Sequence, residues 1–429
     1  MTSLGLDPPS YEARFQDYLP HITLPLLAIF SFTCPPFAGR GILFATLIAI
    51  NYFALFFSPW PPNVYETRNM RYGMTSVWLF VLPIFERLLL HVPERDFWQL
   101  EDAGPIENRH PPPWTWRKVH WAISLAATPR GVGWNFGGRR VNAARLALKE
   151  AGKGRAASVR DSLIQTTIAY LALDATIILA KSAPIPVGWR FNLSTIADIV
   201  VAEVYMFAAV YFAMGLQYSF VATIAVGLGL SPPENWVPLF GSFSDCYTIS
   251  NVWGKFWHTY IRQPVLGISH TITESLRIPP RSIIAYLIHL TTAFIISAFF
   301  HIISLNSIRS DNISLQELIR NMLVFFMAQP IGTVAEALVI DYYQRCGSAE
   351  RMPDAGRGIK KSSSRTSLAV ERPPRLMFRV IGYIWVLCWF SFTGWWFTKG
   401  YIALGARDWP VPFSFWRSIF GRNAVIREN

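Results

Sequence analysis

Six ionisable side chains lie inside or beside long apolar runs, where a charged group is unfavourable. Placing such a residue in a membrane core costs about 3 kcal/mol, so each one is a candidate functional group. Histidine is the best suited of them to accept a proton from a hydroxyl, because its ordinary pKa of about 6.5 lies near neutral pH. The six are Asp174, Glu203, His258, His289, His301 and Glu336.

His301 is the strongest candidate for a general base. It lies within about a turn and a half of the predicted lumenal end of its apolar run, next to Phe299, Phe300 and Ile302. Ser297, four residues earlier on the same helical face, is placed to orient the ring. In an acyl transfer such a base removes the alcohol proton as the oxygen attacks a thioester carbonyl. Judged from the residues alone, a packing role is the commoner one for a lone membrane histidine.

The other membrane residues have competing interpretations. His289 and His301 are twelve residues apart, which puts their rings about 120° apart around a helix. We therefore expect that they do not share a pocket wall and that one is structural. For Asp174, Glu203 and Glu336 we favour hydrogen bonding between helices, and orientation of a histidine or arginine is the alternative.

Motifs of other enzyme classes are absent from the sequence. It has no Gly-x-Ser-x-Gly turn, no Gly-rich phosphate loop, no His-Glu-x-x-His helix and no His-x-x-x-x-Asp arrangement. Asp-rich pairs that would hold magnesium-bound diphosphate are also missing, which weakens a prenyl-transfer interpretation. The four cysteines are scattered, without the paired spacing of a zinc site. We expect neither a metal nor a bound cofactor.

The composition indicates a membrane protein. Of 429 residues, 52% are hydrophobic and only 15% are charged, and 17 are Trp, which favours the membrane interface. The net charge of +12 comes from residues between apolar runs rather than from a basic stripe on a soluble domain. The expected partner is therefore a lipid bilayer and not nucleic acid. The first twenty residues, which include Asp7, Glu12 and Asp17, do not fit a cleavable signal peptide.

Apolar runs of about 20 residues predict an all-α polytopic protein, because that length of helix crosses the hydrocarbon core. The long run at 196–230 contains Gly215, Gly227 and Gly229, which we expect to divide it into a span and a second or re-entrant helix. We predict about eight to ten spans in a single membrane-embedded domain over residues 1–429. The runs lie near 20–37, 41–60, 74–92, 163–181, 196–230, 282–305, 317–341 and 377–404.

Three basic stretches separate these runs, at 117–160, 251–281 and 345–376. Basic loops remain on the cytosolic side of a membrane, so all three are predicted to face the cytosol, with the endoplasmic reticulum as the expected membrane. The stretch at 345–376 is rich in Ser, Arg, Gly and Pro and is predicted to be a flexible loop.

Four stretches together resemble the membrane-bound O-acyltransferase superfamily, and within it the wax synthase-like branch of fungal natural-product pathways. They are Thr128 to Phe136, Trp236 to Pro264, Phe294 to His301 and Phe325 to Val339. The family's aromatic motif ending in Asn or His matches residues 252–258, and its membrane histidine after a Ser-Gly-like pair matches residues 297–301. This sequence has Ala298 where Gly is usual, which adds a methyl group beside the expected tunnel.

The resemblance implies a direct transfer from acyl-CoA without a covalent acyl-enzyme. His301 is the expected general base, and His258, packed beside Trp257, is expected to position or polarise the thioester carbonyl. Lys255 and Arg262 are expected to neutralise the phosphates of coenzyme A, although cations there also satisfy the positive-inside rule. The expected substrate-binding residues are Trp253, Lys255, Trp257, Arg262 and Ser297.

The function expected from this resemblance is transfer of an acetyl group from acetyl-CoA to a hydroxyl of an apolar terpenoid-like or meroterpenoid-like acceptor. A long-chain acyl-CoA:alcohol acyltransferase that makes wax esters is the main enzymatic alternative. A transporter of a small organic metabolite is the alternative from another class, because Asp174, Glu203 or Glu336 could relay protons. The sequence leaves open the acceptor, its regiochemistry and the oligomeric state.

Overall fold

A computed structural model describes residues 15–54, 76–102, 111–184, 186, 192–309, 312–349, 376–405 and 413–420. Across these residues the chain folds into helices joined by loops, and the one strand-like pairing is an isolated bridge between Gln99 and Trp134. The predicted all-α class is confirmed.

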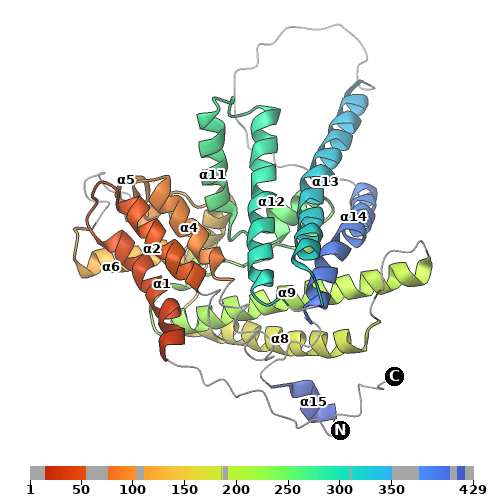
Figure 1. Cartoon of the computed structure of the whole chain (residues 1–429), viewed down its shortest axis with the longest axis horizontal. Helices are drawn as coiled ribbons and strands as arrows, with labels where there is room; N and C mark the ends of the chain where they lie inside the picture. Colours follow the sequence, from red (N-terminus) through yellow and green to blue (C-terminus); the bar gives the residue numbers. More distant parts are fainter. Residues whose placement is uncertain are drawn as a thin grey trace, which may run out of the picture.

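Short helices form the N-terminal region, at the left of Figure 1. They enclose an apolar core in which Phe32, Ile48 and Leu125 are completely buried. The outer faces are apolar too: Ile42 is 70% exposed and Leu26 is 58% exposed, as expected for side chains that face lipid. The helices are α1 (Phe15–Thr33), α2 (Arg40–Ala54), α4 (Trp78–Leu89), α5 (Pro93–Asp96) and α6 (Trp116–Ala127), with a 3₁₀ turn, η2, at Leu100–Asp102.

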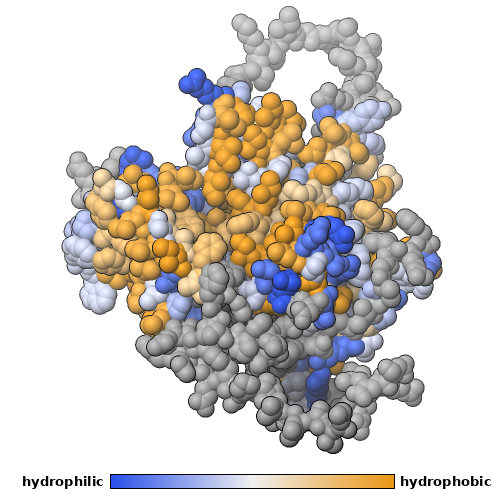
Figure 2. All heavy atoms as spheres, in the orientation of Figure 1, coloured by the Kyte–Doolittle hydropathy of each residue, from blue (hydrophilic) through white to orange (hydrophobic). Residues whose placement is uncertain are grey.

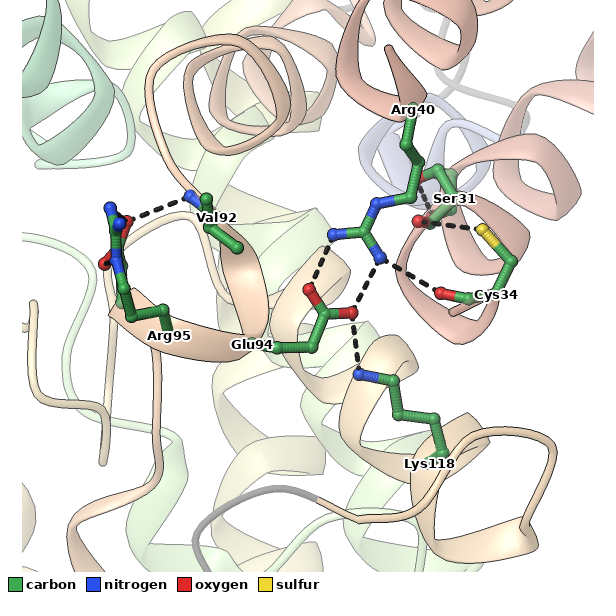
Figure 3. A network of polar contacts seen from close by, with 9 residues as sticks. Ser31, Cys34, Arg40, Val92, Glu94, Arg95 and Lys118 are labelled. Atoms are coloured by element: carbon green, nitrogen blue, oxygen red, sulfur yellow. Dashed lines mark hydrogen bonds and ion pairs between the residues drawn. The ribbon is translucent and has the colours of Figure 1, made fainter. Parts of the chain in front are cut away.

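A buried ion cluster joins these helices (Figure 3). The Arg40 guanidinium donates to both Glu94 carboxylate oxygens, at 2.7 and 2.6 Å, and also to the Cys34 carbonyl at 3.0 Å. Lys118 donates to the same carboxylate at 3.0 Å, and its ammonium lies 3.8 Å from the centre of the Trp121 ring. One carboxylate thus holds three helices together through two almost fully buried cations.

Among the described residues, five helices are long and apolar enough to cross a membrane. Figure 1 shows α8 and α9 side by side, running across the view beneath the more upright α12 and α13. The exposed face of α12 carries Ile283 and Ile284, and Figure 2 shows hydrophobic residues over much of this side of the molecule. The five are α8 (Arg155–Ser182), α9 (Leu193–Gly227), α12 (Ile283–Asn306), α13 (Leu315–Ala349) and α14 (Leu376–Ala403).

The prediction of about eight to ten spans is confirmed only in part. The runs at 20–37 and 41–60 correspond to α1 and α2, which are shorter apolar helices, and the run at 74–92 contains the 12-residue α4. Residues 55–60 and 74–75 of these runs lie outside the described part. Hydropathy alone does not separate such helices from spans, because a short helix with one face on the protein core and an apolar outer face is equally apolar.

The expected division of the 196–230 run is wrong. α9 is one continuous helix of 35 residues, and Gly215 lies within it in open space. The helix ends at Gly227, and Gly229 follows with a φ of +73°, a left-handed conformation that commonly terminates helices. At 1.5 Å per residue α9 is about 50 Å long, so it tilts or extends beyond a hydrocarbon core of about 30 Å.

Shorter elements complete the described chain. The first residues of the basic loop predicted at 345–376 are the end of α13, and residues 350–375 of that loop lie outside the described part. The remaining elements are α7 (Arg139–Glu150), η4 (Pro233–Asn235), η5 (Phe243–Asp245), α10 (Ile249–Asn251), the π-helical η6 (Val252–Phe256), α11 (Arg262–Ser275) and α15 (Phe415–Phe420).

Candidate active site

A cavity of about 2090 Å³ lies where α4, α9, α12, α13 and α14 meet the segment 236–261. Pockets for one small molecule are usually about 300–1,000 Å³, so this cavity has room for two substrates. Its lining includes six of the seven predicted site residues: Trp253, Trp257, His258, Arg262, Ser297 and His301.

Lys255 is the predicted site residue that the cavity lining does not include. Its side chain is exposed, and its carbonyl accepts a hydrogen bond from Arg140 at 3.1 Å. Arg262 lines the cavity but is also exposed, and its guanidinium makes a long 3.5 Å contact with the Gly254 carbonyl. Of the two cations expected to bind phosphates, the structure therefore brings only Arg262 to the cavity.

His301 is held in one orientation by its own helix. Its Nδ1 lies 2.8 Å from the main-chain carbonyl of Ser297, one turn earlier in α12. A carbonyl can only accept, so the hydrogen must be on Nδ1, and in the neutral ring Nε2 then keeps its lone pair. Ser297 makes this contact through its main-chain carbonyl and not through its hydroxyl. The result is an imidazole whose free nitrogen is able to take a proton.

Aromatic rings from three other helices surround His301. The ring centre of Phe326 in α13 is 4.9 Å away, that of Phe397 in α14 is 5.8 Å away and that of Trp78 in α4 is 5.9 Å away. Trp78 also stacks on Phe300 at 4.7 Å. The sequence did not single out these three neighbours, because they lie far from His301 in the chain and none of them is ionisable.

His258 follows the π-helical turn η6, which closes when the Trp257 amide donates to the Val252 carbonyl at 2.7 Å. Its ring packs against Trp257 and Tyr260, at 5.3 and 5.6 Å between centres, and its Nδ1 has no hydrogen-bond partner in the described chain. Burial, followed by the nearby charges of His301 and Arg130, lowers the pKa of His258 to about 3. The ring is therefore neutral at physiological pH.

Glu336 and Gln329 of α13 hold the aromatic segment in place. The Glu336 carboxylate accepts the main-chain amides of Ile249 and Ser250, at 2.8 and 3.0 Å, and thus caps the turn that begins α10. The fully buried Gln329 accepts from the indole of Trp253 at 3.2 Å. Glu336 therefore has a structural role between a spanning helix and the segment that carries His258.

Arg130 clamps the same segment from the other side, and sequence analysis did not single it out. Its guanidinium donates to the carbonyls of Val237 and Pro238, at 3.0 and 2.9 Å, and to the Thr259 hydroxyl at 3.2 Å. Gly131 follows it with a φ of +67°, which lets the chain turn sharply there. The one available signal was that Arg130 lies within the stretch Thr128 to Phe136 used for the resemblance.

His289 also lines the cavity, so the expectation that it and His301 do not share a wall is wrong. The lining face of α12 runs through Tyr286, His289, Ala293, Ser297 and His301. At 100° per residue these positions cover an arc of about 120°, which is wide enough to include both rings. His289 Nδ1 lies 2.7 Å from the Ser269 hydroxyl, which is a contact to the neighbouring α11.

Two predicted acidic residues, Asp174 of α8 and Glu203 of α9, differ in their surroundings. Asp174 is completely buried, and its carboxylate accepts the amide of Trp416 at 3.1 Å, which docks α15 onto α8. Glu203 lines the cavity, and its Oε1 has no hydrogen-bond partner among the described residues. Within that part of the chain, no three His, Cys, Asp or Glu side chains are grouped as metal ligands.

Comparison with known proteins gives a family match at the same place. Residues 236–328 match the membrane bound O-acyl transferase family, and this region contains both His258 and His301. No solved structure matches the chain.

Several fungal relatives are similar over part of the chain. The acetyltransferase aurG of Calcarisporium arbuscula is 34% identical over 44% of this chain, and the acetyltransferase fsoF of Humicola fuscoatra is 32% identical over 52%. These alignments cover 40% and 48% of the two relatives, so this chain spans less than half the length of each. The acetyltransferase eriL of Hericium erinaceus is 26% identical over 65% of both chains. The resemblance predicted from the four sequence stretches is confirmed: this chain resembles the membrane bound O-acyl transferase family and its fungal acetyltransferases.

Proposed function

We propose that this chain is a membrane-embedded O-acyltransferase that moves an acetyl group from acetyl-CoA to a hydroxyl of an apolar, terpenoid-like acceptor. The observation that carries the proposal is the His301–Ser297 hydrogen bond, which leaves the imidazole Nε2 free at the wall of a cavity large enough for two substrates. The matches to acetyltransferases support the choice of acyl group.

In the proposed reaction, His301 Nε2 takes the proton of the acceptor hydroxyl as its oxygen bonds to the thioester carbon. The carbonyl oxygen becomes negatively charged, and an N–H of the neutral His258 ring donates to it. The carbonyl then re-forms as the carbon–sulfur bond breaks, and the coenzyme A sulfur accepts from His301 the proton that came from the acceptor hydroxyl. The products are an ester and free coenzyme A, and no group of the protein is consumed.

The cavity wall supports this chemistry in two ways. Aromatic rings around His301 keep bulk water from the thioester, which would otherwise be hydrolysed. Three arginines line the described cavity. Arg130 and Arg145 already bind carbonyl, amide and carboxylate oxygens, whereas Arg262 makes only a long contact, so its guanidinium can bind a coenzyme A phosphate.

We also propose that the host membrane is the endoplasmic reticulum and that the basic stretches 117–160, 251–281 and 345–376 face the cytosol, where acyl-CoA is available. A long-chain acyl donor remains the enzymatic alternative. The transport alternative loses two of its three candidate proton relays, because Asp174 and Glu336 accept main-chain amides and thus have structural partners.

Acetyl transfer in microsomes tests the proposal. Membranes from cells that express the chain are supplied with labelled acetyl-CoA and a hydroxylated terpenoid, and ester formation is measured. His301→Ala is expected to lower kcat by about 10²–10⁴-fold, because a general base contributes about that much. His258→Ala is expected to lower kcat through loss of the donor to the carbonyl oxygen.

His270→Gln is the matched control, because this exposed histidine of α11 lies outside the cavity lining and should retain wild-type activity. Unchanged ester formation by His301→Ala at equal protein level would contradict the proposed base. Absence of transfer from acetyl-CoA, with activity from a long-chain acyl-CoA, would select the wax ester alternative.

A further inference from the structure

Glu203 is the acidic residue that the described spanning helices contribute to the cavity lining, and the proposed chemistry and the fold leave it unexplained. Asp174 and Glu336 each accept main-chain amides, whereas Glu203 makes no hydrogen bond or ion pair within the described chain. It lies in α9 and lines the cavity beside Val200 and Val204. A carboxyl group in an apolar wall loses its hydration, and that loss is offset only when a partner arrives.

Gly394 of the facing helix α14 leaves space for the Glu203 side chain. Its carboxyl carbon and Oε1 lie 3.3 Å from the point where a side chain on Gly394 of α14 would begin, so the glycine leaves the carboxyl its space. Phe397, three residues further along α14, has its ring centre 5.8 Å from that of His301. Residues three apart on a helix are about 5–6 Å apart, which puts Glu203 on the order of 10 Å from the catalytic ring.

We infer that Glu203 binds a second polar group of the acceptor while His301 deprotonates the hydroxyl that is acylated. This inference rests on the proposed function and narrows its substrate class. The acceptor would be a rigid apolar molecule with a hydroxyl at one end and another hydrogen-bond donor, such as a second hydroxyl, on the order of 10 Å away. Glu203 would thus decide which of two hydroxyls meets His301, and it acts as a specificity-determining residue.

A pair of acceptors that differ only at the second hydroxyl tests this inference. The probes are a fused-ring terpenoid diol and the mono-alcohol of the same skeleton, each with acetyl-CoA and the full-length chain in microsomes. Wild type is expected to prefer the diol by about 10- to 100-fold in kcat/KM, which is the range for a hydrogen bond to a charged or desolvated partner. Glu203→Leu should remove this preference by raising KM for the diol, while kcat for the mono-alcohol stays within a few-fold of wild type.

Two further variants keep the test informative if the leucine variant does not accumulate. Glu203→Gln retains the shape and should keep part of the preference, and Gly394→Ala should reduce it by crowding the carboxyl. Glu274→Gln, at an exposed position near the end of α11, is the matched acidic control and should behave as wild type. A binding readout without chemistry is thermal stabilisation of the purified protein by the diol, which should be lost in the Glu203 variants.

The two proposals fail in different ways. If wild type acetylates neither probe but a Glu203-dependent stabilisation by the diol remains, the acyl-transfer proposal fails and the recognition site stands. If wild type acetylates both probes and the diol preference is the same in Glu203→Leu and Glu203→Gln, the inference is overturned and the acyltransferase stands.

Discussion

The N-terminal region and the cavity differ in whether their buried ionisable groups have partners. Around α2, α5 and α6 each buried charge has a close partner, as Figure 3 shows for Arg40, Glu94 and Lys118. At the cavity the Nδ1 of His258 and the Oε1 of Glu203 have none among the described residues. Paired groups contribute to folding, whereas unpaired groups that face an open volume are available to a substrate. The contrast separates the structural charges of this chain from the functional ones.

The largest change in stability is expected when the paired cluster of Arg40, Glu94 and Lys118 loses its anion. Glu94→Gln removes the anion between Arg40 and Lys118 and leaves two buried cations without a counter-charge, so the free energy of unfolding should fall by about 3–5 kcal/mol. Chemical denaturation of the protein in detergent measures it. Arg95→Gln, at a surface ion pair whose arginine is 74% exposed, is the control and should change stability far less, because solvent screens the pair. Equal effects of the two substitutions would contradict a structural role for the cluster.

The acid side of the stability profile offers a second check on Glu94. Burial alone would raise its pKa, but the hydrogen bond from Arg40 and the charge of Lys118 outweigh burial and lower it. Its stabilising contribution is therefore present above the ordinary glutamate pKa and disappears as the pH falls through the lowered value. Glu94→Gln should abolish this part of the pH dependence.

An intermediate change in stability is expected at Arg130, which joins the loop after α6 to the segment before His258. Arg130→Met keeps most of the side-chain volume but removes the donors to the Val237 and Pro238 carbonyls, so the free energy of unfolding should fall by about 2–3 kcal/mol. Thermal unfolding of the purified protein measures the change, and the exposed Arg139→Met is the control. If Arg139→Met destabilises the protein as much as Arg130→Met, then Arg130 does not clamp the segment before His258.

The smallest change in stability is expected at His258, whose Nδ1 has no partner among the described residues. Burial holds the pKa of His258 at about 3, below its ordinary value of 6.5, so folding favours the neutral ring. This contribution is complete above pH 6.5 and is lost as the pH falls from there towards 3. The slope is at most about 1.4 kcal/mol per pH unit, and it lies below that ceiling because part of the ring faces the cavity. His258→Gln should flatten the stability profile between pH 4.5 and 6.5, and coinciding profiles would show that His258 is not desolvated.

The sequence predicts the long spanning helices well and the N-terminal helices poorly. The runs at 282–305 and 377–404 agree with α12 and α14 to within a residue, because about 20 consecutive apolar residues define a span directly. The run at 74–92 is equally apolar, yet α4 has only 12 residues and packs in a protein core. Whether an apolar helix faces lipid or protein depends on its neighbours, which hydropathy does not contain.

The candidate site shows the same division. The spacing within α12 correctly brings Ser297 next to His301, because residues four apart in a helix are adjacent. The sequence did not predict that His289 and His301 line the same cavity. How much of the α12 surface faces the cavity depends on the positions of the neighbouring helices. Arg130 and Gln329 were missed because their partners are carbonyl and indole groups distant in the chain. The spacing of residues in the sequence predicts contacts within one helix, whereas contacts between distant segments depend on how the helices pack.

The contact between Asp174 and Trp416 links the tail of the chain to a spanning helix. Asp174 is completely buried, and its described partner is an amide that belongs to α15. Removing residues from 413 onward would therefore leave a carboxylate stranded in the interior of α8 without that donor. Shortened versions prepared for crystallisation or expression should keep residues 413–420, because α15 packs on α8 through Trp416.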